Sequence, residues 1–213
     1  MSEPTIFIVD NDDALRESLQ WLLESGGARS EGFASAEAFL AACTPERAGC
    51  LLLDVRLPGM SGIALQGELA RARIQLPVIV MTGYADVGTA VSMLKRGAFD
   101  FFEKPFSDAA LFERVQQAVE FDAARRLTRA QREHLAARLA NLTAREREVF
   151  DQVVHGKPNK VVASEFGISE KTVEVHRARV MQKLGAGSLA ELVRIDLLAA
   201  QPTESLRMAR MRA

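Results

Sequence analysis

The sequence has few of the residues that build disulfide frameworks or membrane spans. Its 213 residues include two cysteines, Cys43 and Cys50, which are too few and too weakly patterned for a disulfide framework or a metal site. We expect both thiols to be reduced and to act as small hydrophobic side chains. Apolar clusters such as residues 50–53 are far shorter than the roughly 20 residues that span a bilayer. The first residues, MSEPTIFIVD, have no basic flank before an apolar segment, so we expect a cytoplasmic protein without a secretory signal or a membrane span.

Each half of the chain is poor in charge of one sign. Residues 1–121 hold 10 Lys and Arg against 17 Asp and Glu, whereas residues 122–213 hold 17 against 11 and all three histidines. This asymmetry, hidden in a net charge of −1, suggests two domains with different partners, the second partner being polyanionic. Such charges also serve solubility alone, so they do not by themselves decide between classes of function.

Residues 1–121 alternate short apolar runs with segments of helical periodicity. The pattern predicts strands near residues 5–9, 28–33, 50–53, 78–81 and 98–102, and helices near 14–24, 35–42, 63–73, 87–96 and 107–121. Residues 50–53 are almost continuously apolar, which is typical of a buried central strand. Five strand–helix units in this order predict an α/β domain with a five-stranded, doubly wound parallel sheet.

The rest of the chain has helical patterns only. Residues 122–140 contain neither Pro nor Gly and favour a stiff helical linker over a flexible tether. The leucines at 127, 135 and 139 fit either packing within a domain or pairing with a second copy of the helix. Residues 141–200 predict an all-α domain of four helices, near 143–154, 159–166, 169–184 and 188–199, and residues 201–213 a frayed basic tail.

The second and third helices of this domain are separated by a short turn at Gly167. Such a pair is the arrangement of a helix-turn-helix, whose second helix enters the major groove of DNA. Val173, Val180 and Leu184 mark the face of the second helix toward the core, and Lys and Arg on its polar exterior would displace counterions from DNA phosphates. The spacing alone does not separate this arrangement from other three-helix bundles.

Polar residues follow four of the predicted strands. Asp10 and Asn11 follow the first strand, Asp54 the third, Thr82 the fourth and Lys104 the fifth. In a doubly wound sheet the ligand site lies at the carboxyl ends of the strands. Mg²⁺ prefers oxygen ligands and commonly bridges carboxylates to phosphate. A phosphoryl group on Asp54 would share its charge with the metal and Lys104, and Thr82 could donate a hydrogen bond to it. Each residue alone is commonly a turn former or a surface charge, but together they favour a site.

The segments FIVDNDDALRESLQWLL, LLLDVRLPGMSG, VIVMTGYAD and GAFDFFEKPF resemble the receiver domain of response regulators over residues 4–121. The resemblance implies a flavodoxin-like fold in which Asp54 accepts phosphate from a sensor histidine kinase. The implied Mg²⁺ ligands are Asp10, Asn11, Asp54 and the carbonyl oxygen of Arg56. The implied switch residues and phosphate contacts are Thr82, Phe101, Lys104 and Pro105, with a cis peptide between Lys104 and Pro105.

One position departs from the receiver pattern, which usually has two adjacent acids after the first strand. Here the second acid is replaced by Asn11, so we expect weaker Mg²⁺ binding unless Asp12 or Asp13 compensates. By resemblance, phosphorylation remodels the face formed by the fourth helix, fifth strand and fifth helix, which then dimerises or releases the second domain. The residues expected on that face are Leu94, Lys95, Ala98, Phe101 and Phe112.

Residues 141–195 resemble the LuxR/FixJ-type DNA-binding domain, including its Leu-Thr-x-Arg-Glu opening and its Lys-Thr-Val-x-x-His-Arg run. The resemblance implies that the protein binds double-stranded promoter DNA, acts with RNA polymerase and forms a homodimer when phosphorylated. The implied base-reading residues are Glu174, Val175 and Ala178. The implied phosphate contacts are Lys160, Lys171, Thr172, Arg177, Arg179 and Lys183. Glu146 and His176 are expected to be structural.

The sequence thus predicts a two-component response regulator and transcription factor that is not an enzyme beyond its own phosphorylation and dephosphorylation. The predicted domains are a receiver (1–121), a linker (122–140), a DNA-binding domain (141–200) and a tail (201–213). Two alternatives stay open. Asn11 leaves open a regulator that binds DNA independently of phosphorylation and whose receiver is only a dimerisation platform. An aspartyl-phosphate hydrolase would place an acid/base Asp where Arg56 stands, which argues against that class.

Overall fold

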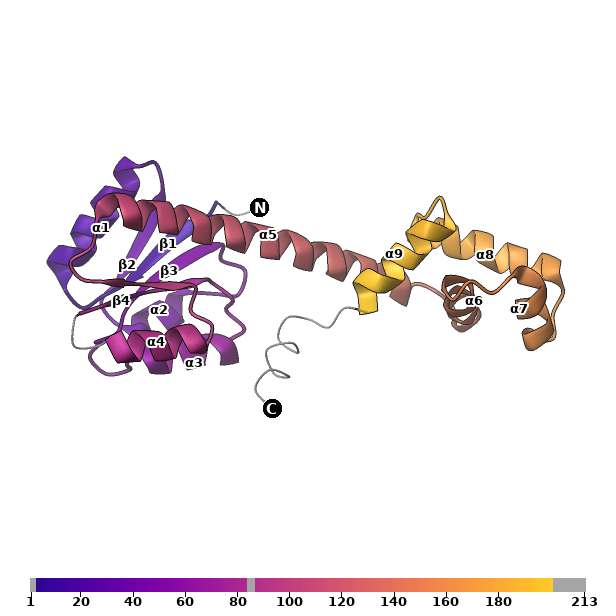
Figure 1. Cartoon of the computed structure of the whole chain (residues 1–213), viewed down its shortest axis with the longest axis horizontal. Helices are drawn as coiled ribbons and strands as arrows, with labels where there is room; N and C mark the ends of the chain where they lie inside the picture. The colour runs from indigo at the N-terminus through magenta and orange to yellow at the C-terminus, as the bar shows by residue number, and fades with distance from the viewer. Residues whose placement is uncertain (1–2, 84–86, 201–213) are drawn as a thin grey trace. The chain divides into compact units, whose positions relative to one another are not determined.

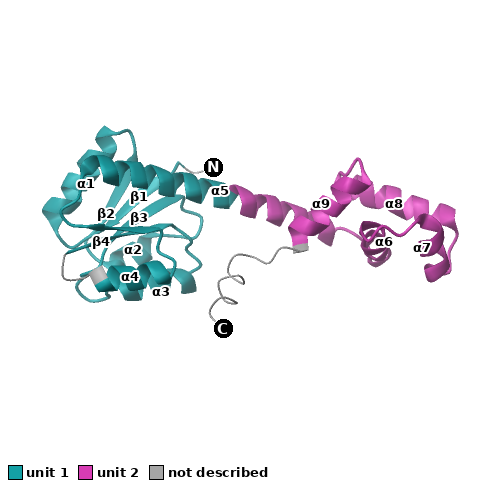
Figure 2. Ribbon diagram, in the orientation of Figure 1, with its two compact units in different colours: residues 1–126 teal, residues 127–213 magenta. Residues whose placement is uncertain are grey.

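The computed structural model describes residues 3–83 and 87–200 (Figure 1). The chain divides into two compact units, residues 1–126 and 127–213 (Figure 2). The predicted tail, residues 201–213, lies outside the described residues. Within the described ranges, no helix combines the length and the apolar character needed to cross a membrane.

The first unit is built on a five-stranded parallel sheet with the strand order β2-β1-β3-β4-β5. The strands are β1 (Thr5–Val9), β2 (Arg29–Phe33), β3 (Gly49–Asp54), β4 (Val78–Thr82) and β5 (Asp100–Glu103). The helices between and after them are α1 (Asp13–Ser25), α2 (Ala36–Ala42), α3 (Gly62–Arg71), α4 (Val87–Lys95) and α5 (Asp108–Ala140). The predicted doubly wound sheet is therefore confirmed.

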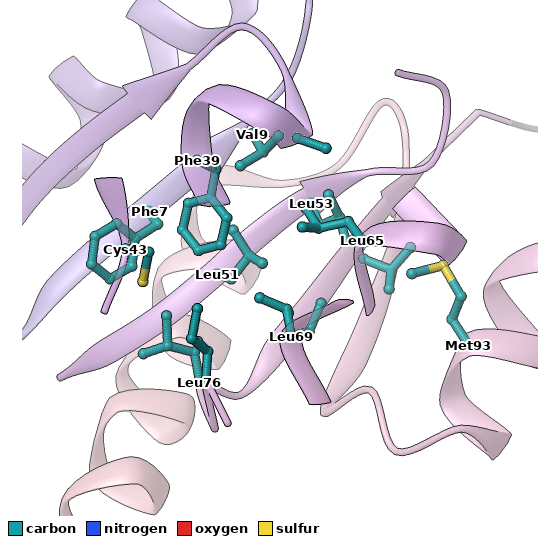
Figure 3. Close-up of a cluster of buried hydrophobic side chains, with 14 of the residues drawn as sticks. Phe7, Val9, Phe39, Cys43, Leu51, Leu53, Leu65, Leu69, Leu76 and Met93 are labelled. Carbon is teal, nitrogen blue, oxygen red and sulfur yellow. The ribbon is translucent and has the colours of Figure 1, made fainter. Parts of the chain in front are cut away.

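The three central strands divide their side chains between two hydrophobic clusters, because successive residues of a strand point to opposite faces of the sheet. One face packs against α2, α3 and α4, and Figure 3 shows this cluster. Its labelled members are Phe7, Val9, Phe39, Cys43, Leu51, Leu53, Leu65, Leu69, Leu76 and Met93. The other face packs against α1 and α5, with buried residues Ile6, Ile8, Leu19, Leu23, Cys50, Leu52, Ile79, Met81, Leu111, Val115 and Ala118.

Capping side chains mark the first turns of three helices that cover the sheet. Asp12, Ser35 and Ser61 each cap the first turn of a helix by accepting a hydrogen bond from a backbone N–H three residues later. Such caps supply acceptors for N–H groups that have no partner inside the helix. They align the starts of α1, α2 and α3, and so set the loops that follow β1, β2 and β3.

The two cysteines are free and buried, one in each cluster. Burial raises the pKa of Cys43 to about 11 and that of Cys50 to about 12, so both thiols stay protonated at neutral pH. Their predicted role as small hydrophobic side chains is confirmed.

Helix α5 joins the predicted fifth helix and the predicted linker into one helix of 33 residues. No Gly or Pro interrupts residues 108–140, so the helix has no local reason to end at 121. The side chain of Asp122 is buried and accepts hydrogen bonds from Gly49 N at 2.9 Å and from Arg126 Nε at 2.6 Å. These contacts belong to the first unit, which continues to Arg126.

The second unit contains the end of α5 with α6 (Ala144–Val154), α7 (Asn159–Phe166), α8 (Glu170–Leu184) and α9 (Leu189–Ala200). Thr143 and Glu146 form the predicted capping box at the start of α6. Leu139 is buried in the core of this unit and Leu135 packs against it, whereas Leu127 is exposed. Two of the three leucines noted in the linker therefore serve packing within a domain.

We predict that Gly49→Ala destabilises the first unit. Gly49 has a φ of +131°, and a Cβ atom there would lie 1.8 Å from the carbonyl oxygen of Thr5. The free energy of unfolding should fall by about 2 kcal/mol or more. Urea unfolding followed by the fluorescence of Trp21, the single tryptophan, measures the change. Gly67→Ala is the matched control, because Gly67 lies within α3 and has open space around its Cβ position, so that variant should keep or raise the stability.

Candidate functional sites: an acidic pocket and a helix-turn-helix

The carboxyl ends of the strands bring three of the predicted site residues into direct contact. Asp10 follows β1 and Asp54 ends β3, and both carboxylates are buried. Lys104, which follows β5, places its Nζ atom 2.8 Å from Asp10 Oδ2 and 2.6 Å from Asp54 Oδ1. One ammonium group thus bridges two carboxylates that are far apart in the sequence.

Backbone donors complete the environment of the two carboxylates. Arg56 N donates to Asp54 Oδ2 at 2.6 Å, and Asp12 N donates to Asp10 Oδ1 at 2.9 Å. Burial raises the pKa of Asp54, and the hydrogen bonds from Lys104 act in the opposite direction. Although burial alone would lower the pKa of Lys104, its hydrogen bonds to Asp10 and Asp54 raise it, so the ammonium form is favoured.

The remaining predicted residues of the pocket lie around this bridge. Thr82 is fully buried at the end of β4, and its hydroxyl donates to Gly83 O at 3.1 Å. Phe101 is half-buried and packs against the cluster on the α2, α3 and α4 face. The Lys104–Pro105 peptide is cis, as the resemblance implies.

Asn11 and its neighbours differ in their availability to a metal. Asn11 is exposed beside the pocket. The carboxylate of Asp12 is used as the cap of α1, and that of Asp13 forms an ion pair with Arg16. Arg16 also donates to the carbonyl oxygen of Asp10 at 2.8 Å. The two acids expected to compensate for Asn11 therefore already have partners within the chain.

The pocket offers hard oxygen donors but few charges. Across the described ranges, no three His, Cys, Asp or Glu side chains gather closely enough to hold a metal by themselves. The carboxylates of Asp10 and Asp54, the Asn11 amide, the Arg56 carbonyl and water would together suit Mg²⁺, which keeps several waters and needs only one or two carboxylates. The donor chemistry thus fits the metal, with less charge than two adjacent acids would supply.

An apolar cavity of about 450 Å³ adjoins the pocket. It lies between α1 and the start of α5, and its lining includes Leu15, Trp21, Leu22, Lys104, Pro105 and Phe106. Trp21 is 74% exposed. Sequence reasoning missed this feature, because a single aromatic residue off the leucine stripe of its helix is common on protein surfaces and does not reveal a cavity beside it.

Phe112 does not lie on the face predicted for it. It packs with the cluster between α1, α5 and the sheet, and a Cβ atom on Gly26 would lie 2.3 Å from its ring. Gly26 directly follows α1, so the Phe112 ring packs against the end of that helix. The remaining members of the predicted face are placed as follows: Leu94, Ala98 and Phe101 are half-buried, and Lys95 is exposed at the end of α4.

Helices α7 and α8 form a helix-turn-helix. Gly167 ends α7 with a left-handed backbone (φ 63°), and Ser169 caps α8 by accepting from Thr172 N at 3.1 Å. Val173, Val180 and Leu184 are buried in the core, as predicted. The exposed residues predicted to contact DNA are Lys160, Lys171, Thr172, Glu174, Val175, Ala178 and Arg179.

Two cations predicted to contact phosphates have partners inside the unit. Lys183 Nζ lies 2.6 Å from Glu146 Oε2 and also donates to Asn141 O, so its ammonium completes the capping network of α6. Lys183 thus has a structural role, and because its side chain is exposed, its predicted phosphate contact stays a prediction. Arg177 Nη1 donates to Asn159 Oδ1 at 3.2 Å. Glu146 is buried, in keeping with its predicted structural role.

These two sites define a class of protein in which an acidic receiver-type pocket accompanies a DNA-binding helix pair. The family of response regulator receiver domains matches residues 6–116, and the luxR family of bacterial regulatory proteins matches residues 140–195. The transcriptional regulatory protein FixJ of Azorhizobium caulinodans is 47% identical over 91% of this chain and 92% of its own length. FixJ of Rhizobium meliloti is 44% identical over 92% of this chain and 97% of its own.

Solved structures agree with this relationship. The response regulator StyR superposes with a TM-score of 0.84 at 42% identity, covering 91% of this chain and 98% of that one. Full-length FixJ from B. japonicum has a TM-score of 0.59 at 39% identity, covering 95% and 100%. The chain therefore belongs to the FixJ-like two-component response regulators, transcription factors with a receiver domain and a LuxR-type helix-turn-helix. Membership implies a histidine kinase as partner, DNA as ligand and, as for receivers in general, Mg²⁺ in phosphorylation.

We predict that acid weakens the second unit through Glu146. The hydrogen bond from Lys183, with that from Thr143 N, holds the pKa of Glu146 at about 2, below its ordinary value of 4.5. Because the folded pKa is the lower one, the carboxylate stabilises the fold above about pH 4.5, and this contribution is lost as the pH falls toward 2. Thermal unfolding as a function of pH should show this loss in the wild type.

Glu146→Gln should be less stable than the wild type at pH 6, and the difference should shrink as the pH approaches 2. Glu148→Gln serves as the control, since Glu148 forms an exposed pair with Arg145. A constant difference between Glu146→Gln and the wild type across this pH window would contradict the assignment.

Proposed function

We propose that Asp54 accepts a phosphoryl group from a sensor histidine kinase, and that this modification controls dimerisation and sequence-specific binding to promoter DNA. The observation that carries the proposal is the Lys104 bridge between Asp10 and Asp54 at the end of β3. A carboxylate oxygen of Asp54 forms a bond to phosphorus while the bond from phosphorus to the kinase histidine breaks, and the leaving imidazole takes up a proton. Lys104 then balances part of the added negative charge.

The other residues of the pocket have supporting roles in this proposal. Asp10, Asn11, Asp54 and the Arg56 carbonyl would hold Mg²⁺, which supplies positive charge for the phosphoryl oxygens when bound. The Thr82 hydroxyl donates to Gly83 O in the unmodified protein and would turn toward the phosphoryl group. This rotation, with a change at Phe101, would favour the active arrangement of the face that includes Leu94, Lys95 and Ala98.

The cavity beside Lys104 supports the kinase as the phosphate donor. A protein that delivers phosphate to Asp54 has to cover the open side of the pocket, and the cavity lined by Trp21, Leu22 and Phe106 adjoins it there. An exposed tryptophan next to a hollow apolar surface is a common anchor of protein interfaces. We therefore propose that the kinase docks on this surface.

The second unit has free cations for DNA. The side chains of Lys160, Lys171 and Arg179 are exposed and make no hydrogen bond or ion pair with any described part of the chain, so they remain available to phosphates. Glu174, Val175 and Ala178 lie exposed on α8, where they would read bases. Glu174 can accept from a cytosine amino group, and Val175 can contact a thymine methyl group. RNA polymerase remains a proposed partner on the family resemblance alone.

Incubation with acetyl phosphate and Mg²⁺ should add one phosphoryl group to the wild type and none to Asp54→Asn, because the neutral amide oxygen is a poor nucleophile compared with a carboxylate oxygen. Intact mass measures the addition. Light scattering of the same samples should show dimerisation stimulated by phosphate in the wild type and not in Asp54→Ala.

The metal arm of this experiment uses Asn11→Asp. A second carboxylate strengthens cation binding, so this variant should gain phosphate at lower Mg²⁺ concentrations than the wild type. If neither the wild type nor Asn11→Asp gains mass at high Mg²⁺, the regulator that acts independently of phosphorylation is favoured.

Trp21→Ala should slow phosphate transfer from the partner kinase by roughly tenfold, because the proposed interface loses the aromatic side chain that it would bury as an anchor. Phosphorylation by acetyl phosphate, which needs no docking surface, should be unchanged. Phe121→Ala is the matched control, since Phe121 is an exposed aromatic residue that does not line the cavity. Equal slowing with both phosphate donors would count against docking at this surface.

A further inference from the structure

Arg177 occupies a position on α8 that would ordinarily be apolar. Val173, Val180 and Leu184 are buried in the core. Arg177 lies four residues after the first of them and three before the second, so it shares their face of the helix. It is half-buried. An arginine in such a position can lay its aliphatic stem along apolar surface and bring its guanidinium to the edge.

That edge is the amino end of α7. Arg177 Nη1 donates to Oδ1 of Asn159, the first residue of α7, at 3.2 Å. The amino end of a helix carries partial positive charge, so it is an unfavourable place for a cation that has no anionic partner. The chain nevertheless holds the guanidinium there with a neutral amide.

Several other cations of the second unit are paired with carboxylates instead. Their ion pairs are Arg145–Glu148 at 2.7 Å, Arg147–Asp151 at 3.2 Å, Lys157–Glu165 at 2.7 Å and Lys183–Glu146 at 2.6 Å. A carboxylate balances the charge of its partner, whereas the amide of Asn159 fixes the position of Arg177 and leaves its full positive charge for an external anion.

We propose that Asn159 is a positioning residue for DNA binding: it holds the Arg177 guanidinium at the amino end of α7, where the guanidinium meets a backbone phosphate. A guanidinium has five N–H donors and no acceptor, so the bond to Asn159 leaves donors for phosphate oxygens. Holding the side chain in place before binding reduces the conformational entropy lost on association. This inference rests on the proposed binding of α8 to DNA.

The test uses the full-length chain and a short fluorescent DNA duplex of arbitrary sequence. Affinity for such DNA comes from phosphate contacts, so no operator sequence is needed. Fluorescence anisotropy at several salt concentrations gives the affinity and its salt slope. Arg177→Ala should reduce the slope by about one, as loss of one phosphate contact does.

Two substitutions of Asn159 separate positioning from charge. Asn159→Asp should reduce the salt slope as Arg177→Ala does, because the new carboxylate neutralises the guanidinium. Asn159→Ala should weaken binding about threefold at fixed salt, the effect of one lost hydrogen bond. This threefold effect should vanish when Arg177 is already alanine, since nothing is left to position.

Lys171→Ala is the matched control, because Lys171 is an exposed cation of α8 that does not contact Asn159. Its effect should add to that of Asn159→Ala. Thermal unfolding checks the fold of each variant, and Asn159→Ser replaces Asn159→Ala if the latter is unstable. The proposal is overturned if loss of the Asn159 side chain weakens binding equally with and without Arg177, or if Asn159→Asp keeps the full slope. A wild-type chain that does not bind the duplex even at low salt would instead overturn DNA binding itself.

Discussion

The ammonium group of Lys104 lies between two buried carboxylates, and the arrangement of the first unit makes this contact possible. Removing two carboxylates from water is costly unless an opposite charge and hydrogen bonds replace the solvent. The sheet order places β1 beside β3, so Asp10 and Asp54 are neighbours, whereas β5 is separated from β3 by β4. A lysine is long enough to reach across the end of β4, where the smaller Thr82 is buried. In the proposed function, a phosphoryl group on Asp54 would change the charge balance of this contact.

The second unit also contains a buried carboxylate whose charge is balanced by a lysine. Glu146 is buried because Lys183 and the capping box of α6 satisfy its oxygens. Lys183 therefore has a partner within the chain, and its predicted contact with DNA phosphate stays a prediction. We expect polyanion binding to depend on which cations the fold leaves without carboxylate partners, and not only on the number of basic residues in this half of the chain.

Sequence patterns predicted which helices and strands form more accurately than where those elements end and which neighbours their side chains contact. Apolar runs bounded by turn residues located β1, β3 and β4, because strands buried on both faces need nearly continuous apolar sequence. The predicted end of the receiver at 121 stays a prediction, since the helical pattern continues past it and only the contact of Asp122 with Gly49 shows that the first compact unit extends further. Phe112 was assigned to the wrong side of α5 because periodicity defines a stripe on a helix and does not say which neighbour the stripe meets.

The sequence by itself determined the class of each domain, the residues gathered at the strand ends and the helix pair of the second unit, because these follow from local periodicity, turn residues and family motifs. Only the tertiary structure decided which charges pair: Lys104 with Asp10 and Asp54, Lys183 with Glu146, and Arg177 with Asn159. The physical reason is that an ion pair or hydrogen bond depends on distances between side chains that are remote in the sequence, and a one-dimensional pattern does not contain those distances.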